Sequence, residues 1–325
     1  PGAVHGAWEG LVAGARHHLH LLFYIWRDDR TGRALRDRLA ERARAGVEVR
    51  VLYDAVGSWG LPRGFFDPLA AAGGRAAAFM PVRLLVASPT VNFRNHRKVV
   101  IADGRRACTG GINVGDEYLG WHGLGLAIQG PGVNQLQEVF VDDWHFTTGE
   151  ELTGRDYFCE PAAHGGADPP GSAVCETITS GPDQPFNATR EMVFLAITRC
   201  RTRVWIATPY FIPDAALMLA LRTAVYRGVD VRLYLPARSD APLVRRASRV
   251  FYRGLLEGGV GVFEYPGMLH AKAMVLDQDA VLVGSANLDN RSFRLNFELS
   301  SFVLDAALNR RLSALLAGLD GDSRE

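Results

Sequence analysis

The chain repeats one order of strand, helix and strand, and this repeat restricts its fold more than any other feature. In the first copy, the apolar run at residues 21–25 precedes a helical pattern that extends from about residue 32 to residue 45. The sequence GVEVRVLYD follows, and a second strand is expected at residues 47–53. Two short strands joined by one helix indicate a βαβ unit.

The same order returns in the second half of the chain. A strand and turn are predicted at residues 204–212, a helix at residues 215–227, and an answering strand in GVDVRLYLP. Gly46 and Gly228 follow the two helices, and glycine commonly ends a helix because it adopts the left-handed conformation. The fold class predicted is therefore α/β, with two similar halves and largely parallel sheets.

The length of 325 residues is sufficient for two domains. Residues 160–184 are rich in Gly, Pro, Ala and Asp and show little periodicity, so we predict a linker or surface excursion there. The predicted organisation is a first half at residues 1–159, this linker, and a second half at residues 185–325. The chain opens at Pro1 with neither Met nor a signal-peptide pattern, so we expect a fragment whose natural N-terminus is missing.

One motif, His-x-Lys-x4-Asp, occurs once in each half. Its members are His96, Lys98 and Asp103 in the first half and His270, Lys272 and Asp277 in the second. On a strand, residues i and i+2 point to the same face, so each His should project beside its Lys. Asn113 and Asn287 each follow their histidine by 17 residues, within GGIN and GSAN, and Ser285 belongs to the latter. An Asp after an apolar strand is also a common turn former, and that alternative stays open for Asp103 and Asp277.

The distribution of lysine strengthens the motif. Of the 36 basic residues, only Lys98 and Lys272 are lysines, and both occupy the position two residues after a motif histidine. A compact ammonium is not interchangeable with a guanidinium where one phosphate oxygen must be met at close range. The pattern therefore indicates a functional site rather than two chance strands.

These residue types suit displacement at a phosphodiester, without metal or other cofactor. One histidine attacks phosphorus and becomes a phosphohistidine, while the other protonates the leaving oxygen and then deprotonates the incoming alcohol or water. Lysines and asparagines supply fixed donors for charge on the phosphoryl oxygens. Because neither half holds the full set, we expect both halves to share one active-site cleft.

The paired motifs resemble those of the phospholipase D superfamily. The surrounding segments are similar to bacterial cardiolipin synthase, notably in YIWRDDRTG, NHRKVVIADGRRACTGGINVGDEYLG, TPYFIPD and VGSANLDNRSFRLNFE. This resemblance implies α/β/α sandwich halves and transfer of a phosphatidyl group between two phosphatidylglycerol molecules, with release of glycerol. The resemblance also implies that the protein acts at the cytoplasmic face of a bacterial membrane. The residues implied to hold phosphate are Lys98, Asn113, Lys272, Ser285 and Asn287.

One departure from the family pattern affects the mechanism. The family commonly has Trp-x-Asp after the first Gly-Gly-x-Asn, and here Gly123 follows Trp121 and His122 where that Asp is expected. In the second half, Glu298 stands where the family places a carboxylate. A catalytic histidine needs a partner on its second ring nitrogen. We therefore hypothesise that Glu298 orients His270 as the nucleophile and that His96 is the acid and base. Asp116 and Glu117 are the nearest first-half carboxylates.

Three alternatives stay open. A phospholipase D would release phosphatidic acid by the same chemistry, because water competes for the same phosphohistidine. A nuclease is less favoured, since the net charge of +1 provides no general attraction for a phosphate backbone, and we expect no nucleic-acid partner. A non-catalytic homologue would keep the fold and only bind phospholipid. Aromatic segments near Trp59, Phe65 and Val250 would meet a membrane surface or belong to the core.

Overall fold

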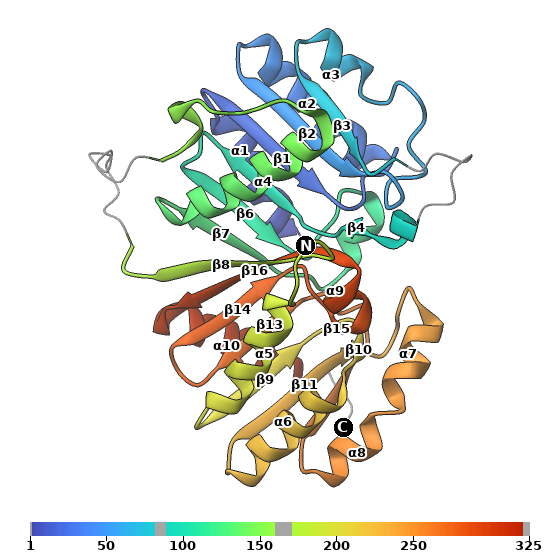
Figure 1. Cartoon of the computed structure of the whole chain (residues 1–325), viewed down its shortest axis with the longest axis vertical. Coiled ribbons are helices and arrows are strands. Elements are labelled where there is room, and N and C mark those ends of the chain that lie inside the picture. The colour runs from blue at the N-terminus through green and yellow to red at the C-terminus, as the bar shows by residue number, and fades with distance from the viewer. Residues whose placement is uncertain (1, 82–88, 160–170, 321–325) are drawn as a thin grey trace. The chain divides into compact units, whose positions relative to one another are not determined.

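A computed structural model describes residues 2–81, 89–159 and 171–320. The chain divides into two compact units, of which unit 1 comprises residues 1–120 and 125–171. Unit 2 comprises residues 121–124 and 172–325 (Figure 1). None of the helices in the described residues is long and apolar enough to cross a bilayer.

Unit 1 contains one mixed sheet. Its elements are α1 (Gly2–Gly14), β1 (His18–Phe23), α2 (Arg30–Arg44), β2 (Glu48–Asp54), α3 (Asp67–Ala71), β3 (Arg75–Phe79), the 3-10 helix η1 (Pro89–Asn92), β4 (Arg94–Asn95), β5 (Val99–Ala102), β6 (Arg106–Gly110), η2 (Asp116–Gly120), β7 (Gly125–Gln129), α4 (Gly132–Thr148) and η3 (Arg155–Tyr157). The strand order is β3-β2-β1-β5-β6-β7. The first three strands are parallel and the remaining pairings are antiparallel.

Unit 2 repeats this arrangement. Its elements are β8 (Val174–Ser180), α5 (Ala188–Arg199), β9 (Arg203–Ala207), β10 (Phe211–Ile212), α6 (Ala215–Tyr226), β11 (Asp230–Pro236), α7 (Pro242–Arg249), α8 (Tyr252–Glu257), β12 (Gly261–Tyr265), β13 (Ala273–Leu276), β14 (Ala280–Gly284), β15 (Leu288–Asp289), α9 (Asn290–Arg294), β16 (Asn296–Leu304) and α10 (Ala306–Asp320). The order β12-β11-β9-β13-β14-β16 is that of unit 1, again with three parallel strands followed by antiparallel pairings.

Helices cover both faces of each sheet, which confirms the predicted α/β/α halves. In unit 1, α4 contacts strands on one face, while α1, α2 and α3 contact one another and form the other layer (Figure 1). In unit 2, α10 takes the place of α4, and α5, α6 and α8 form the second layer. All six residues of β1 are buried, as expected for a strand covered on both sides.

The predicted helices and first strands lie within a few residues of their observed positions, and Gly46 and Gly228 have the positive φ angles expected after a helix. The prediction of largely parallel sheets is wrong for the motif strands, because tight hairpins join β5 to β6 and β13 to β14. The predicted linker also contains an element that was not foreseen. Residues 174–180 form β8, which pairs antiparallel with β16. Part of that stretch, residues 160–170, lies outside the described residues.

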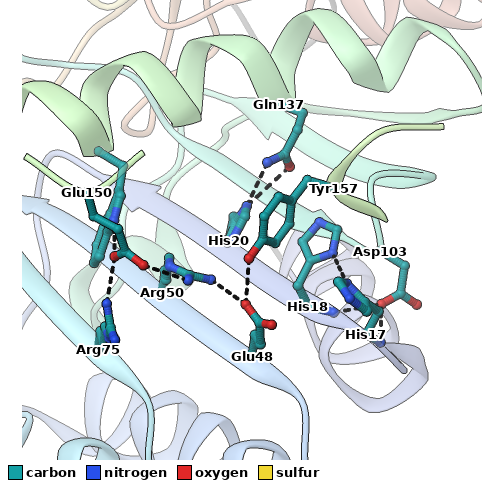
Figure 2. Close-up of polar contacts among 11 residues, drawn as sticks. His17, His18, His20, Glu48, Arg50, Arg75, Asp103, Gln137, Glu150 and Tyr157 are labelled. Atoms are coloured by element: carbon teal, nitrogen blue, oxygen red, sulfur yellow. Dashed lines mark hydrogen bonds and ion pairs between the residues drawn. The ribbon is translucent and has the colours of Figure 1, made fainter. Parts of the chain in front are cut away.

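A buried polar cluster supports the amino-terminal end of β1 in unit 1 (Figure 2). His20 stacks on Phe140 at 4.4 Å between ring centroids and shares a hydrogen bond with Gln137. Burial lowers the pKa of His18 to about 4 and places the pKa of His20 well below its ordinary value. Both imidazoles are therefore neutral parts of the core at neutral pH.

Tyr157 closes this cluster from the end of unit 1. Its hydroxyl donates to Glu48 at 2.7 Å, and Arg50 pairs with Glu48 at 2.8 Å and with Glu150 at 2.9 Å (Figure 2). Two carboxylates thus balance the partly buried guanidinium of Arg50. The cluster joins β1 and β2 to the segment that follows α4.

Candidate active site

In unit 1, the motif histidine and lysine lie together, as their i, i+2 spacing predicts. His96 and Lys98 are buried, at 8% and 2% exposure. Both contact Tyr24, whose ring centroid is 5.0 Å from that of His96 and 5.3 Å from Lys98 Nζ. Lys98 Nζ also donates to the His96 carbonyl at 2.5 Å. The segment between β4 and β5, which is not itself a strand, therefore presents an imidazole and an ammonium to the same tyrosine ring.

Arg97, between His96 and Lys98, and Asn95, just before His96, hold this segment in place. Arg97 forms a buried ion pair with Asp143 of α4, with N–O distances of 2.7 and 2.8 Å. Asn95 Nδ2 donates to the same carboxylate at 2.8 Å, and the Asn95 backbone N–H donates to Asp54 at 2.9 Å. Burial raises the pKa of Asp54, which is opposed by backbone N–H groups and by Arg94. Two buried carboxylates thus hold the backbone that carries His96.

In unit 2, the ammonium faces the imidazole directly. Lys272 Nζ lies 3.2 Å from both ring nitrogens of His270 and donates to the His270 carbonyl at 3.1 Å. Burial lowers the pKa of Lys272 to about 7, against the opposing influence of Glu298, Asp240 and Asp289. This lysine is therefore poised between its charged and neutral forms near neutral pH.

The carboxylate of Glu298 is completely buried and firmly held. Ser285 Oγ donates to it at 2.5 Å, and Asn296 Nδ2 donates at 3.0 Å. The Ser285 hydroxyl also accepts the Leu299 backbone N–H at 3.0 Å, so its donor and an acceptor site are both used. This arrangement favours Ser285 as the residue that fixes Glu298, and its predicted contact with phosphate stays a prediction. Orientation of His270 by Glu298 stays a prediction.

The two motif-associated asparagines are buried but have different partners. Asn113 Oδ1 accepts the Ile25 backbone N–H at 3.2 Å. Asn287 donates its backbone N–H to Ser292 Oγ at 3.1 Å, and its side-chain oxygen has no hydrogen-bond partner within the described part of the chain. Asn287 therefore retains unused hydrogen-bonding capacity near the second motif, whereas Asn113 also serves to hold the backbone.

The two motif aspartates lie in turns at the far ends of their strands. Asp103 and Asp277 adopt φ angles of +57° and +47°, a conformation that Asp tolerates better than most residues. Asp103 accepts the backbone N–H groups of residues 16–18, and Asp277 accepts those of residues 201–203. Each aspartate thus ties a hairpin turn to the start of the neighbouring strand, which favours the turn-forming alternative left open for both, and a catalytic role stays a prediction.

The second unit can be compared directly with a known family. Residues 193–319 match the family described as "Cardiolipin synthase, PLD-like domain". This part of the chain is a phospholipase D-like domain of the cardiolipin synthase family. Because unit 1 has the same strand order and the same motif, the predicted phospholipase D-like fold is confirmed for the pair.

Curated relatives extend the similarity over most of the chain. A cardiolipin synthase of Geobacillus kaustophilus is 43% identical over 297 residues, which cover 89% of this chain and 58% of the relative. The major cardiolipin synthase of Bacillus subtilis is 38% identical over 309 residues, covering 93% and 63%. The chain resembles bacterial cardiolipin synthases, and it spans about three-fifths of the length of these relatives.

Solved structures show the same fold at low sequence identity. The phosphatidylserine synthase of Haemophilus influenzae matches with a TM-score of 0.74 and 15% identity, over 99% of this chain and 85% of that one. A polyphosphate kinase of Porphyromonas gingivalis matches with a TM-score of 0.61 and 13% identity, over 97% and 47%.

The segment that departs from the cardiolipin synthase pattern contacts the second motif. Residues 121–124 belong to unit 2, and the Trp121 ring lies 4.9 Å from the His270 ring. The backbone of His122 bonds to that of Met268 at 2.8 Å and to that of His270 at 2.7 Å. His122 Nδ1 is 3.0 Å from the Tyr265 hydroxyl. Trp121, which keeps the family's Trp, thus packs against the motif imidazole, while Gly123 stands where the family has a carboxylate.

Sequence reasoning noticed this departure but did not predict that Trp121 contacts His270. It sought a partner for His96 in the first half, with Asp116 and Glu117 as candidates. Asp116 instead accepts from the backbone and hydroxyl of Thr31, and Glu117 pairs with Arg27 at 2.9 Å. Both carboxylates stabilise the start of α2 and its surroundings. The signal that could have identified Trp121 was the loss of the carboxylate at Gly123.

Proposed function

We propose that the chain is a phosphatidyltransferase that makes cardiolipin from two phosphatidylglycerol molecules and releases glycerol. The observation that carries this proposal is the pair of buried His-x-Lys segments, each just before a strand, in a chain about 40% identical to cardiolipin synthases. The proposal requires both motifs to act on one phosphate, because neither unit alone supplies two histidines of this kind. We place the reaction at the cytoplasmic face of the bacterial membrane, where the lipid substrate is found.

In the first step, a ring nitrogen of His270 forms a bond to phosphorus, and the bond from phosphorus to the glycerol headgroup oxygen breaks. His96 gives its proton to that oxygen, so glycerol leaves neutral and a phosphohistidine remains. The neutral imidazole is the nucleophilic form. The buried Glu298 carboxylate, which is close enough to Lys272 to influence its pKa, supports the choice of His270 as the nucleophile.

In the second step, a glycerol hydroxyl of another phosphatidylglycerol gives its proton to His96. Its oxygen bonds to phosphorus, the bond from His270 to phosphorus breaks, and cardiolipin is released. Lys98, Lys272 and Asn287 donate to the phosphoryl oxygens as charge develops on them. Water in place of the alcohol would give phosphatidic acid, so the hydrolase alternative depends only on which acceptor reaches the intermediate.

The test offers labelled phosphatidylglycerol in mixed micelles, without added metal, and identifies the products by mass. We expect cardiolipin and glycerol from the wild-type chain and from His145→Ala, which changes an exposed histidine of α4. No product is expected from His270→Ala. Phosphatidic acid as the main product would establish a phospholipase D instead, and binding without turnover would establish a non-catalytic homologue.

A second experiment tests the assignment of the two histidines. Quenching in alkaline denaturant during turnover, followed by peptide mapping without acid, should recover the phosphatidyl label on His270 in the wild-type chain. Label on His96 would reverse the two roles while leaving the overall reaction intact.

A further inference from the structure

Helix α7 exposes an apolar and basic surface in unit 2. Leu243 and Val250 are 78% and 77% exposed, and Arg246 is exposed between them. Their spacing of three and four residues places these side chains on one side of the helix. We call this set of three residues the α7 face. Leu243 and Val250 are the two most exposed large hydrophobic side chains in the described residues, and they flank one arginine.

The charge around the α7 face is strongly positive. Residues 238–257 contain five arginines and two carboxylates, a net charge of +3 in a chain whose total is +1. Glu257 pairs with Arg253 at 2.7 Å, and Arg249 pairs with Glu264 at 2.7 Å. Within the described residues, no carboxylate pairs with Arg246. Its guanidinium is therefore available to an anionic partner.

The α7 face is built onto the same part of the fold as the second motif. Ser248 of α7 accepts the Phe211 backbone N–H at 3.3 Å, and Phe211 pairs with Leu288, the residue after Asn287. Asp240, in the loop before α7, is close enough to Lys272 to influence its pKa. The rest of the helix segment is anchored, since Phe251 packs on Phe211 at 6.2 Å between centroids. The exposed side chains are thus carried on a fixed support near the site.

The equivalent place in unit 1 shows a similar feature. The segment after β2 exposes Trp59 at 68%, as the segment after β11 exposes Leu243. This segment is also tied to its motif, because Ser58 Oγ donates to the carbonyl of Tyr24, whose ring contacts His96. Each unit therefore presents a large apolar side chain after the second strand of its repeat.

We propose that the α7 face binds the surface of an anionic lipid bilayer, with Leu243 and Val250 entering the headgroup region and Arg246 meeting lipid phosphates. Basic amphipathic helices with exposed aliphatic residues bind membranes in this way. The inference rests on the proposed function, in that an enzyme acting on phosphatidylglycerol must take its substrate from such a surface. It adds the identity of the surface that docks.

The test measures co-sedimentation of the 325-residue chain with vesicles of phosphatidylcholine alone or mixed with equal phosphatidylglycerol. We expect binding to the mixed vesicles only, weakened by high salt. The change Arg246→Gln should lower the partition coefficient roughly fivefold. The double change Leu243→Ser and Val250→Ser should lower it at least about tenfold.

The matched control is Leu219→Ser with Arg222→Gln on α6, because Leu219 is also 62% exposed. This control should bind vesicles as the wild-type chain does. Equal binding by the α7 variants would overturn the proposal, as would a change in their oligomeric state on gel filtration, which would make a second copy of the chain the partner.

Turnover of a short-chain phosphatidylglycerol below its micellar concentration separates docking from chemistry. The α7 variants should turn over this soluble substrate as the wild-type chain does. If the wild-type chain does not turn it over, the proposed function is wrong, whereas the vesicle-binding result still tests the α7 face.

Discussion

Units 1 and 2 have the same strand order and the same motif, but they support the motif with different contacts. In unit 1, the residue between histidine and lysine is Arg97, which is held by Asp143 of α4. In unit 2, that residue is Ala271, and the polar support comes instead from Glu298, Ser285 and Asn296 beside the motif. One motif can thus be fixed from behind by an ion pair or from beside by a hydrogen-bonded carboxylate.

The two units also differ at the end of each sheet where the motif aspartate lies. The hairpin aspartates bind the start of β1 in one unit and of β9 in the other, but β1 carries His18 and His20 there. The corresponding strand β9 has Arg203 and Trp205, with the Arg232 guanidinium 4.4 Å from the indole centroid. Protonation of these histidines can therefore destabilise this end of unit 1. Strand β9 has no histidine at the equivalent positions.

The largest expected effect is on the buried ion pair of unit 1. The change Asp143→Ala should lower the free energy of unfolding by about 3–5 kcal/mol, because it removes the buried carboxylate that pairs with Arg97 and accepts from Asn95. Chemical denaturation followed by tryptophan fluorescence measures this change. The neighbouring exposed Asp142→Ala is the control and should have little effect. If Asp143→Ala proves as stable as the control, the contrast between the two supports is wrong.

Replacing either lysine by arginine tests whether the units contribute equally to phosphate binding. Lys98→Arg and Lys272→Arg should each lower kcat/KM about 10²–10³-fold, since the wider guanidinium cannot occupy the same buried position. In the wild-type chain, kcat/KM should also fall as pH rises through about 7, because Lys272 then loses its charge. That basic limb should disappear in Lys272→Arg and persist in Lys98→Arg. If the fall in kcat/KM with rising pH is unchanged in both variants, a group other than Lys272 causes it.

Much of this comparison was predictable from the sequence, since the repeat, the paired motifs and the glycines that follow the two helices identify both halves. The antiparallel pairing was not predictable from periodicity, because a buried strand of four residues shows the same apolar run in either direction. Strand β8 was missed because it follows a Gly- and Pro-rich stretch. The contact of Trp121 with His270 depends on which unit the segment joins, and sequence distance alone does not encode that.

Acid should distinguish the two units in stability. The pKa of His18 is about 4 in the folded chain and about 6.5 when exposed, so the unfolded state binds more protons between these values. Stability is therefore complete above pH 6.5 and should decline as pH falls toward 4, by about 3 kcal/mol at most. Hydrogen exchange should show earlier loss of protection in β1 and β2 than in β9 and β11. His18→Gln should remove much of this difference, and equal loss in both units of the wild-type chain would contradict it.

A smaller effect is expected at the indole of unit 2. Trp121→Ala should lower kcat roughly tenfold with little change in KM if the role of Trp121 is to position the His270 ring, against which it packs. Trp121→Phe should restore most of the rate, since an aromatic ring again packs on the imidazole. If alanine and phenylalanine give the same kcat, the packing contact has no role in orienting the nucleophile.

The buried Lys272 has a consequence for chemical labelling of this protein. An amine whose pKa is about 7 is partly neutral under mild conditions, and the neutral amine is the form that reacts with acylating reagents and aldehydes. The chain has only two lysines, and both belong to the motifs. Apart from the α-amino group, every site of amine modification is therefore a motif residue, and the extent of labelling with and without lipid becomes a direct report of occupancy.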